Sequence, residues 1–220
     1  PIHAGPEIGV ASTKAFLGQM IVLFILCLKL AKIREDIDDR TYQLNLSNLK
    51  KLPDAIEKSL KVENSIQVMA KEFLDAKGSM FLGRGLSFPI ALEGALKLKE
   101  LSYVHAEGYP AGEMKHGPLA LIEEGLPVIV IAPKDKYFEK TLSNMQEVIA
   151  RGGKILFITD HKKELINENI RFGVRMPSIG NLLSPIVLTI PLQLLAYHVA
   201  LLKNCDIDKP RNLAKSVTVE

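Results

Sequence analysis

Two short apolar runs rich in β-branched residues constrain the fold of this chain most strongly. Residues 127–132 read Pro-Val-Ile-Val-Ile-Ala, and residues 154–159 read Lys-Ile-Leu-Phe-Ile-Thr. A continuous apolar run of this length is typical of a strand that is buried on both faces, as in a parallel sheet. The segment between them, 137–151, has an amphipathic pattern and is followed by Gly152 and Gly153, which favour a helix end. This strand–helix–strand order predicts a parallel sheet with covering helices.

Further segments extend the same pattern in both directions. Residues 79–82 form a short apolar strand, and a helix is expected over 89–103. Residues 172–176 are a shorter, more polar strand that suits a sheet edge. A Ser-Pro pair opens a long apolar helix over 184–203. The chain is therefore assigned to the α/β class, with a doubly wound, mostly parallel sheet sandwiched by helices.

The N-terminal part contains a different kind of apolar segment. Residues 16–31 are almost continuously apolar, but Lys14 and Lys29 bound the apolar run too closely for a spanning helix, and Gln19 falls within it. A membrane-spanning helix needs about 20 apolar residues, so we expect a buried helix or a helix packed between domains, and no membrane partner. The first residues show no initiator Met and no signal-peptide pattern, so we expect a piece of a longer protein.

A change in composition suggests where the domains divide. Residues 34–40 are a polar charge cluster, and residues 41–51 mix Leu with polar residues in a way typical of a connection or a short helix, so this part is interpreted as a linker. A helix with Pro53 in its first turn is expected over 53–77. The tail after residue 205 has little periodicity. We therefore divide the chain into 1–51, 52–205 and the tail 206–220.

Composition and charge narrow the class of function. With 47% hydrophobic residues the chain can bury a sizeable core, which excludes intrinsic disorder. The 28 basic and 25 acidic residues are scattered and give a net charge of only +3, so no nucleic-acid partner is expected. Cys27 and Cys205 are too far apart to suggest a disulfide framework or a metal knuckle, which fits a reducing, cytoplasmic setting.

The loops that follow the strands are the places to search for a ligand site. In open parallel sheets, ligands bind outside the carboxyl ends of the strands. The segment 83–87, Gly-Arg-Gly-Leu-Ser, could turn backbone N–H groups toward an anion at the start of the next helix. It lacks the full spacing of glycines of a dinucleotide site, so a plain tight turn is the alternative.

Three ionisable residues share one face of the helix expected over 89–103. Glu93, Lys97 and Glu100 are spaced by four and three residues, so their side chains can pair. The apolar residues around them favour partial burial, which would tune their pKa values for acid–base chemistry. A structural ion pair remains the other interpretation.

The segment 104–118 is dense in Gly, Pro and ionisable side chains. His105, Glu107, Glu113 and His116 could suggest a metal site, but none has the close helical spacing of a zinc motif, so no metal is expected. His116 precedes Gly-Pro, which holds it at a rigid turn. Its near-neutral pKa would suit proton transfer.

Four segments together carry a resemblance to a known family. They are residues 7–16, 91–100, 112–118 and 209–220. In this order they resemble the isomerase half of the glutamine:fructose-6-phosphate amidotransferase family, and the likeness spans essentially the whole chain. The resemblance implies a sugar isomerase (SIS) domain, which this family carries twice. The second copy would be complete here, the first would be represented only by its end, and the family's phosphate-binding loop would lie upstream of Pro1.

The resemblance also implies roles for individual residues. Glu100 matches the carboxylate base that moves a proton between carbons 1 and 2 of the sugar, and Lys97 matches a lysine that assists at the neighbouring oxygen. His116 matches the histidine that opens the sugar ring and comes from the neighbouring subunit, which implies a homodimer. Lys215 matches the lysine that forms an imine with the open-chain ketose.

Three further positions match residues that line the family's sugar site. These positions are Val10, Ser12 and Ala214, beside Lys215 itself. Ser12 could hydrogen-bond a substrate oxygen, whereas Val10 and Ala214 would act through the backbone. All three could equally be packing residues. The resemblance implies neither a metal nor any other cofactor.

The implied reaction converts fructose 6-phosphate and glutamine-derived ammonia into glucosamine 6-phosphate. Its partner would be a glutaminase domain elsewhere in the same full-length chain. A non-catalytic SIS-type sugar-phosphate sensor is one alternative, and a fructosamine-phosphate deglycase is another. A sensor needs no base, ring opener or imine lysine, and the ending Asn-Leu-Ala-Lys-Ser-Val-Thr-Val-Glu favours the synthase.

Overall fold

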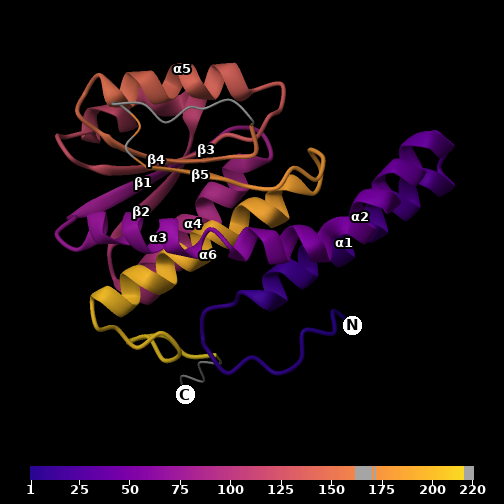
Figure 1. Cartoon of the computed structure of the whole chain (residues 1–220), viewed down its shortest axis with the longest axis horizontal. Helices are drawn as coiled ribbons and strands as arrows, with labels where there is room; N and C mark the ends of the chain where they lie inside the picture. The colour runs from indigo at the N-terminus through magenta and orange to yellow at the C-terminus, as the bar shows by residue number, and fades with distance from the viewer. Residues whose placement is uncertain (162–169, 171, 216–220) are drawn as a thin grey trace.

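The computed structural model describes residues 1–161, 170 and 172–215, and its centre is a five-stranded sheet (Figure 1). The strands are β1 (Gly78–Gly83), β2 (His105–Pro110), β3 (Pro127–Ile131), β4 (Lys154–Thr159) and β5 (Phe172–Arg175). Their order in the sheet is β2-β1-β3-β4-β5, and every neighbouring pair is parallel. The chain thus builds outward from β1 to one side and from β3 to the other, which confirms the doubly wound parallel sheet.

Helices cover both faces of the sheet. The first face carries α3 (Glu63–Ala70), α4 (Ser87–Ser102) and α6 (Ser184–Leu202), and the second carries α5 (Phe138–Ile149) with the 3₁₀ turns η2 (Ala111–His116) and η3 (Pro118–Leu121). Figure 1 shows α5 above the sheet and the other three helices below it. Alternate strand residues face the two cores: Phe81 packs in the first core, whereas Leu82 packs in the second.

The structure confirms most of the predicted elements and adds one strand. The strand at 127–131 is buried throughout and the strand at 154–159 is buried from Ile155 onward, while 172–175 is an edge strand as expected. The sequence analysis missed β2, because His-Ala-Glu-Gly-Tyr-Pro has no apolar run. This strand forms the other edge of the sheet, where only one neighbour and partial burial are required.

Of the two alternatives for residues 41–51, the structure shows a helix, which is longer than the short one expected. The helix α2 runs from Asp39 to Leu60, so Pro53 lies inside it rather than in its first turn. Asp38 caps this helix, because its carboxylate accepts a 2.7 Å hydrogen bond from the Thr41 N–H. The segment expected as one helix over 53–77 is instead the end of α2, then α3, then the short turn η1 (Lys71–Phe73).

The helix α1 (Lys14–Ile33) is not buried within this chain. Leu28 is its one buried residue, while one side of α1, including Leu17 and Phe24, packs against the first core. The exposed large apolar side chains on α1 are Val22, Leu23, Ile25, Leu26, Leu30 and Ile33. By length and composition alone both α1 and α6 could cross a membrane, but 72% of the apolar window of α6 is buried inside the protein, against 6% for α1.

Candidate functional site

The three ionisable residues on α4 form one cluster, as their spacing predicts. The Lys97 ammonium donates a 2.6 Å hydrogen bond to Oε2 of Glu100 and lies 3.6 Å from Oε1 of Glu93. Lys97 is only 4% exposed. A buried ammonium needs a partner, because the loss of its hydration is otherwise uncompensated. The two carboxylates therefore hold Lys97 in one position.

Glu93 has a different environment from Glu100. Burial raises the pKa of the Glu93 carboxyl, against the opposing influence of Lys97. Its Oε1 atom is buried and accepts no hydrogen bond from the described residues. The protonated form of Glu93 is thus favoured by the fold more than that of an exposed carboxyl.

We expect the substitution Glu93→Gln to change how stability depends on pH. A raised pKa in the folded state contributes stability that is complete below the pKa of the unfolded chain and is lost as the pH rises through the folded pKa. Glutamine cannot ionise, so it avoids this loss. As the pH rises from 4 to 8, the free energy of unfolding of Glu93→Gln should therefore increase relative to that of the unsubstituted chain. Urea titration followed by circular dichroism measures this difference.

The matched control is Glu57→Gln, at an exposed position on α2. It should follow the unsubstituted chain across the same pH range. A pH-independent difference for Glu93→Gln would contradict the assigned effect of burial.

A second cluster joins the two ends of the described chain. The Lys215 ammonium donates hydrogen bonds to Oε2 of Glu7 at 2.7 Å and to the carbonyl oxygen of Gly9 at 3.0 Å. The hydrogen bond from Lys215 is the main cause that lowers the pKa of the Glu7 carboxyl. Ser12 donates from its hydroxyl to the other oxygen of Glu7 at 3.3 Å. Glu7 therefore connects Lys215 with Ser12, two of the predicted site residues.

The sequence analysis did not assign a role to Glu7. Glu7 is the first residue of the segment 7–16, one of the four segments that carry the resemblance. Its place in that segment was the one sign in the sequence that Glu7 belongs to the site. In the structure, the Glu7 carboxylate accepts hydrogen bonds from the Lys215 ammonium, the Ser12 hydroxyl and the Ala15 N–H.

Backbone contacts fix the tail against the same loop. The Val10 N–H donates a 2.9 Å hydrogen bond to the carbonyl oxygen of Asp208. Further along, the Arg211 N–H donates to the Tyr103 hydroxyl at 2.7 Å, and the Arg211 guanidinium lies 4.1 Å from the centre of the Tyr103 ring. Tyr103 directly follows α4. The tail thus contacts both the loop around Val10 and the end of α4, and it places the exposed Ala214 beside Lys215. The remaining tail residues, 216–220, lie outside the described residues.

A cavity of about 250 Å³ lies where these parts meet. It is lined by Glu7, Ile8, Gly9, Ala11, Thr13, Lys14, Leu101, Tyr197, Ile207 and Asp208. Leu101 comes directly after Glu100, so the cavity borders the end of α4. The structure therefore brings the loop 7–13, the tail and the end of α4 to one place.

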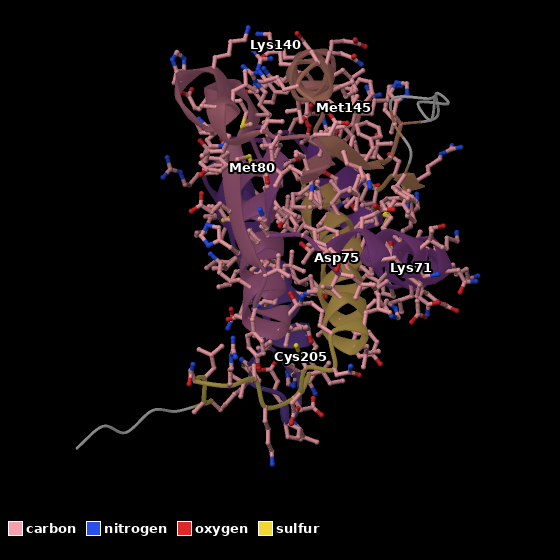
Figure 2. All side chains as sticks on the ribbon, turned by 90° about the vertical axis from the view of Figure 1, so that its left-hand side faces the viewer. Lys71, Asp75, Met80, Lys140, Met145 and Cys205 are labelled. Carbon is pink, nitrogen blue, oxygen red and sulfur yellow. The ribbon has the colours of Figure 1, made fainter. Side chains whose placement is uncertain are left out.

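His116 is not part of this assembly within one chain. It is exposed at the end of η2, whose residue Met114 is buried in the second core beside α5. Figure 2 shows Met145 of α5 and Cys205, which precedes the tail, at opposite ends of the molecule. The buried residues of η2 thus pack on the opposite face of the sheet from α4.

The glycines of the loop 83–87 are explained by packing. A Cβ atom at Gly83 would lie 2.1 Å from the carbonyl oxygen of Ser87, and Gly85 has a φ of +56° with the Tyr137 ring against it. These contacts support the tight turn. A cavity of about 510 Å³ borders Gly85 and Tyr137 and leaves space for a ligand. The binding of an anion at this loop stays a prediction.

The four residues that raised the question of a metal do not converge. His105 Nε2 lies 3.4 Å from Oε1 of Glu107, and the Tyr109 hydroxyl donates to Glu107, which raises the pKa of Tyr109 to about 12. Among the described residues no three His, Cys, Asp or Glu side chains are grouped so that they could hold a metal ion.

Fold and site together define a class of protein. The family model of the SIS domain matches residues 72–203, which contain the whole sheet and the helices α4, α5 and α6. The chain belongs to the SIS domain family.

The curated relatives are more specific. "Glutamine--fructose-6-phosphate aminotransferase [isomerizing]" of Bartonella henselae is 52% identical over 221 residues, which cover 100% of this chain and 36% of the relative. The protein of the same name from Bordetella pertussis is 55% identical over 218 residues, which cover 99% of this chain and 36% of the relative. The resemblance drawn from the four segments is thereby confirmed.

A solved structure agrees with this result. The C-terminal domain of glucosamine-fructose-6-phosphate aminotransferase from Francisella tularensis superposes with a TM-score of 0.91 at 46% identity, over 94% of this chain and 59% of that one. The chain therefore spans about a third of the length of its curated relatives and somewhat more than half of this C-terminal domain.

Proposed function

We propose that this chain is the C-terminal part of an isomerising glutamine–fructose-6-phosphate aminotransferase, an enzyme. In this proposal, fructose 6-phosphate and ammonia from glutamine give glucosamine 6-phosphate. The observation that carries the proposal is the bond from Lys215 to the loop 7–12, beside the end of the helix that holds Lys97 and Glu100.

Each proposed role has a chemical requirement that the geometry supports. Glu100 is the base for transfer of the proton between carbons 1 and 2, and its contact with the buried Lys97 fixes its position. Lys97 delivers and removes a proton at the neighbouring oxygen. Lys215 forms the imine with the open-chain sugar. Its present partners, Glu7 and Gly9, hold its ammonium beside Ser12 until the substrate displaces them.

The remaining site residues surround the imine lysine. Ser12 donates a hydrogen bond to a sugar oxygen, and Val10 and Ala214 line the site through their backbones. His116 opens the sugar ring. Because it lies on the other side of the sheet from Lys97, it serves the site of a second copy, which makes the enzyme a homodimer.

The chain organisation follows from the same proposal. Residues 1–51 are the end of a first SIS copy with its connection, 52–205 the second copy and 206–220 the active-site tail. The exposed apolar side of α1 packs against the rest of that first copy rather than a membrane. A glutaminase domain in the same full-length protein supplies ammonia in the cytoplasm, and no nucleic acid or cofactor takes part.

A sensor or a deglycase would keep the same fold. A glucosamine-6-phosphate deaminase from Thermotoga maritima superposes with a TM-score of 0.68 at 26% identity, over 96% of this chain and 58% of that one. A non-catalytic sensor has no need for a buried lysine held between two carboxylates, and the greater likeness to the aminotransferases favours the synthase over a deglycase.

The proposal is tested by exchange of the carbon 1 proton of fructose 6-phosphate with solvent deuterium, followed by NMR. The chain as given is compared with one extended upstream through the complete first SIS copy. We expect exchange only with the extended chain, because the phosphate-binding loop lies upstream. If neither chain exchanges the proton while the extended chain binds the sugar phosphate, the sensor alternative replaces the proposal.

A further inference from the structure

The turn that ends in His116 is anchored to α5 at its base. Ala111 and Met114 are fully buried in the second core, together with Met145 and Val148 of α5. Figure 2 shows Met145 directly below the α5 ribbon. Lys115 and His116, at the end of the turn, are exposed. The core therefore fixes where the turn lies but does not by itself fix the direction of the His116 ring.

Two polar contacts act closer to His116. The Lys115 ammonium lies 3.0 Å from Oε1 of Glu147 on α5. Arg84, from the loop after β1, donates a 3.0 Å hydrogen bond to the side chain of Asn144 on α5, and a Cβ atom at Gly112 would lie 3.1 Å from its guanidinium carbon. Both contacts tie the turn to α5.

The backbone on the other side of His116 is held by a hydrogen bond rather than by side-chain packing, because the Gly117 carbonyl oxygen accepts a 2.9 Å hydrogen bond from the Ala120 N–H. Gly117 has a φ of +145°, and no atom lies within 4 Å of the position that its Cβ would occupy. His116 thus stands between Lys115, whose side chain is paired with α5, and Gly117, whose backbone is fixed by a hydrogen bond. The ion pair at Lys115 is the side-chain contact with α5 that lies next to His116 in the sequence.

This ion pair is unsuited to a purely stabilising role. The side chain of Lys115 is 63% exposed, and ion pairs with such a partner contribute little to stability. The side chain of Glu147 is 19% exposed, and its Oε2 atom is buried without a hydrogen-bond partner among the described residues. A buried carboxylate of this kind has a cost, which is consistent with a role in positioning.

We propose that Glu147 is a positioning residue that acts through Lys115 to orient His116 for the active site of a second copy of the chain. This inference rests on the proposed function, in which His116 opens the sugar ring in the neighbouring subunit. The new element is the role of α5, which packs on the opposite face of the sheet from Lys97 and Glu100 and holds His116 in position for the second copy.

The test uses mixed dimers of the full-length enzyme. Two chains with different affinity tags are coexpressed, and the dimers that carry both tags are isolated. A dimer of Glu147→Gln with Glu100→Gln has one site with an intact Glu100 and an intact Lys115–Glu147 pair opposite it. We expect the Glu147→Gln homodimer to lose about ten-fold or more in synthase turnover, and the mixed dimer to recover to about half of the unsubstituted enzyme.

Matched variants separate geometry from folding. Glu139→Gln changes the same chemical group at an exposed position of α5 and should retain full activity. Lys115→Met removes the exposed partner without touching the core and should be as slow as Glu147→Gln. The exchanged pair Lys115→Glu with Glu147→Lys should restore most of the activity. If the exchanged pair stays as slow as the single variants, the ion pair is not the cause and the inference fails.

A reference dimer distinguishes this inference from the proposed function. The mixed dimer of His116→Ala with Glu100→Gln should also recover about half of the activity. If it recovers and the Glu147→Gln dimer does not, Glu147 acts within its own subunit and only the positioning role is overturned. If the reference dimer itself stays inactive, His116 does not act across the dimer, and both statements fall.

Discussion

Replacement of Lys215 by arginine should abolish the covalent intermediate of the full-length enzyme. In the proposed reaction, the Lys215 amine attacks carbon 2 of open-chain fructose 6-phosphate, water leaves and a C=N bond forms. Borohydride then delivers a hydride to this bond and leaves a stable secondary amine on the protein. Arginine keeps the positive charge that faces Glu7, so the tail should still dock, but the guanidinium does not form the imine.

The expected effects of Lys215→Arg are large. Synthase turnover should fall about a thousandfold or more, since the covalent route is removed rather than misaligned. Mass spectrometry after borohydride treatment should find the sugar adduct on the unsubstituted protein and none on the variant. An adduct of equal yield on Lys215→Arg would place the imine on another lysine. The control Lys209→Arg, in the same tail, should form the adduct normally.

Replacement of Glu100 by glutamine should stop proton transfer while substrate still binds. A positioned general base contributes roughly 10²–10⁴-fold to a rate, so exchange of the carbon 1 proton should fall by about that factor. Glutamine has nearly the same shape as glutamate. The affinity for fructose 6-phosphate, measured by calorimetry, should therefore change little.

A matched variant separates the base from the ion pair. Because Glu100 also holds the buried Lys97, a loss of stability could imitate a loss of catalysis. Glu93→Gln removes the other carboxylate near Lys97 and leaves Glu100 in place. It should retain much more exchange than Glu100→Gln. Near-normal exchange by Glu100→Gln would remove Glu100 from the role of base.

The sequence predicts the centre of this fold because parallel strands buried on both faces are continuously apolar. The runs at 127–131 and 154–159 predict such strands, and the structure contains them. The spacing of Glu93, Lys97 and Glu100 predicts that their side chains cluster on one helix face, as they do. Strand β2 was missed because an edge strand can be built from polar residues. The continuity of α2 through Pro53 was not predicted, because its polar first half is stabilised by the Asp38 cap and by docking of its second half.

The candidate site depends on contacts that periodicity does not encode. The bond from Lys215 to Glu7 joins residues at the two ends of the described chain, and no local pattern implies it. The resemblance supplied Lys215 and Ser12 but not Glu7, which holds them together. The same holds for Lys115 and Glu147, since the one lies in a polar loop and the other on an amphipathic helix.

The packing of η2 and α4 on opposite faces of the sheet has a consequence for the behaviour of the proposed enzyme in solution. If His116 and Lys97 of one active site must come from different copies, a single copy lacks a complete active site. Turnover then depends on the equilibrium between monomer and dimer. Specific activity should then decline on dilution below the dimer dissociation constant, even though each subunit remains folded. The cell would control such an enzyme partly through the amount of protein it makes.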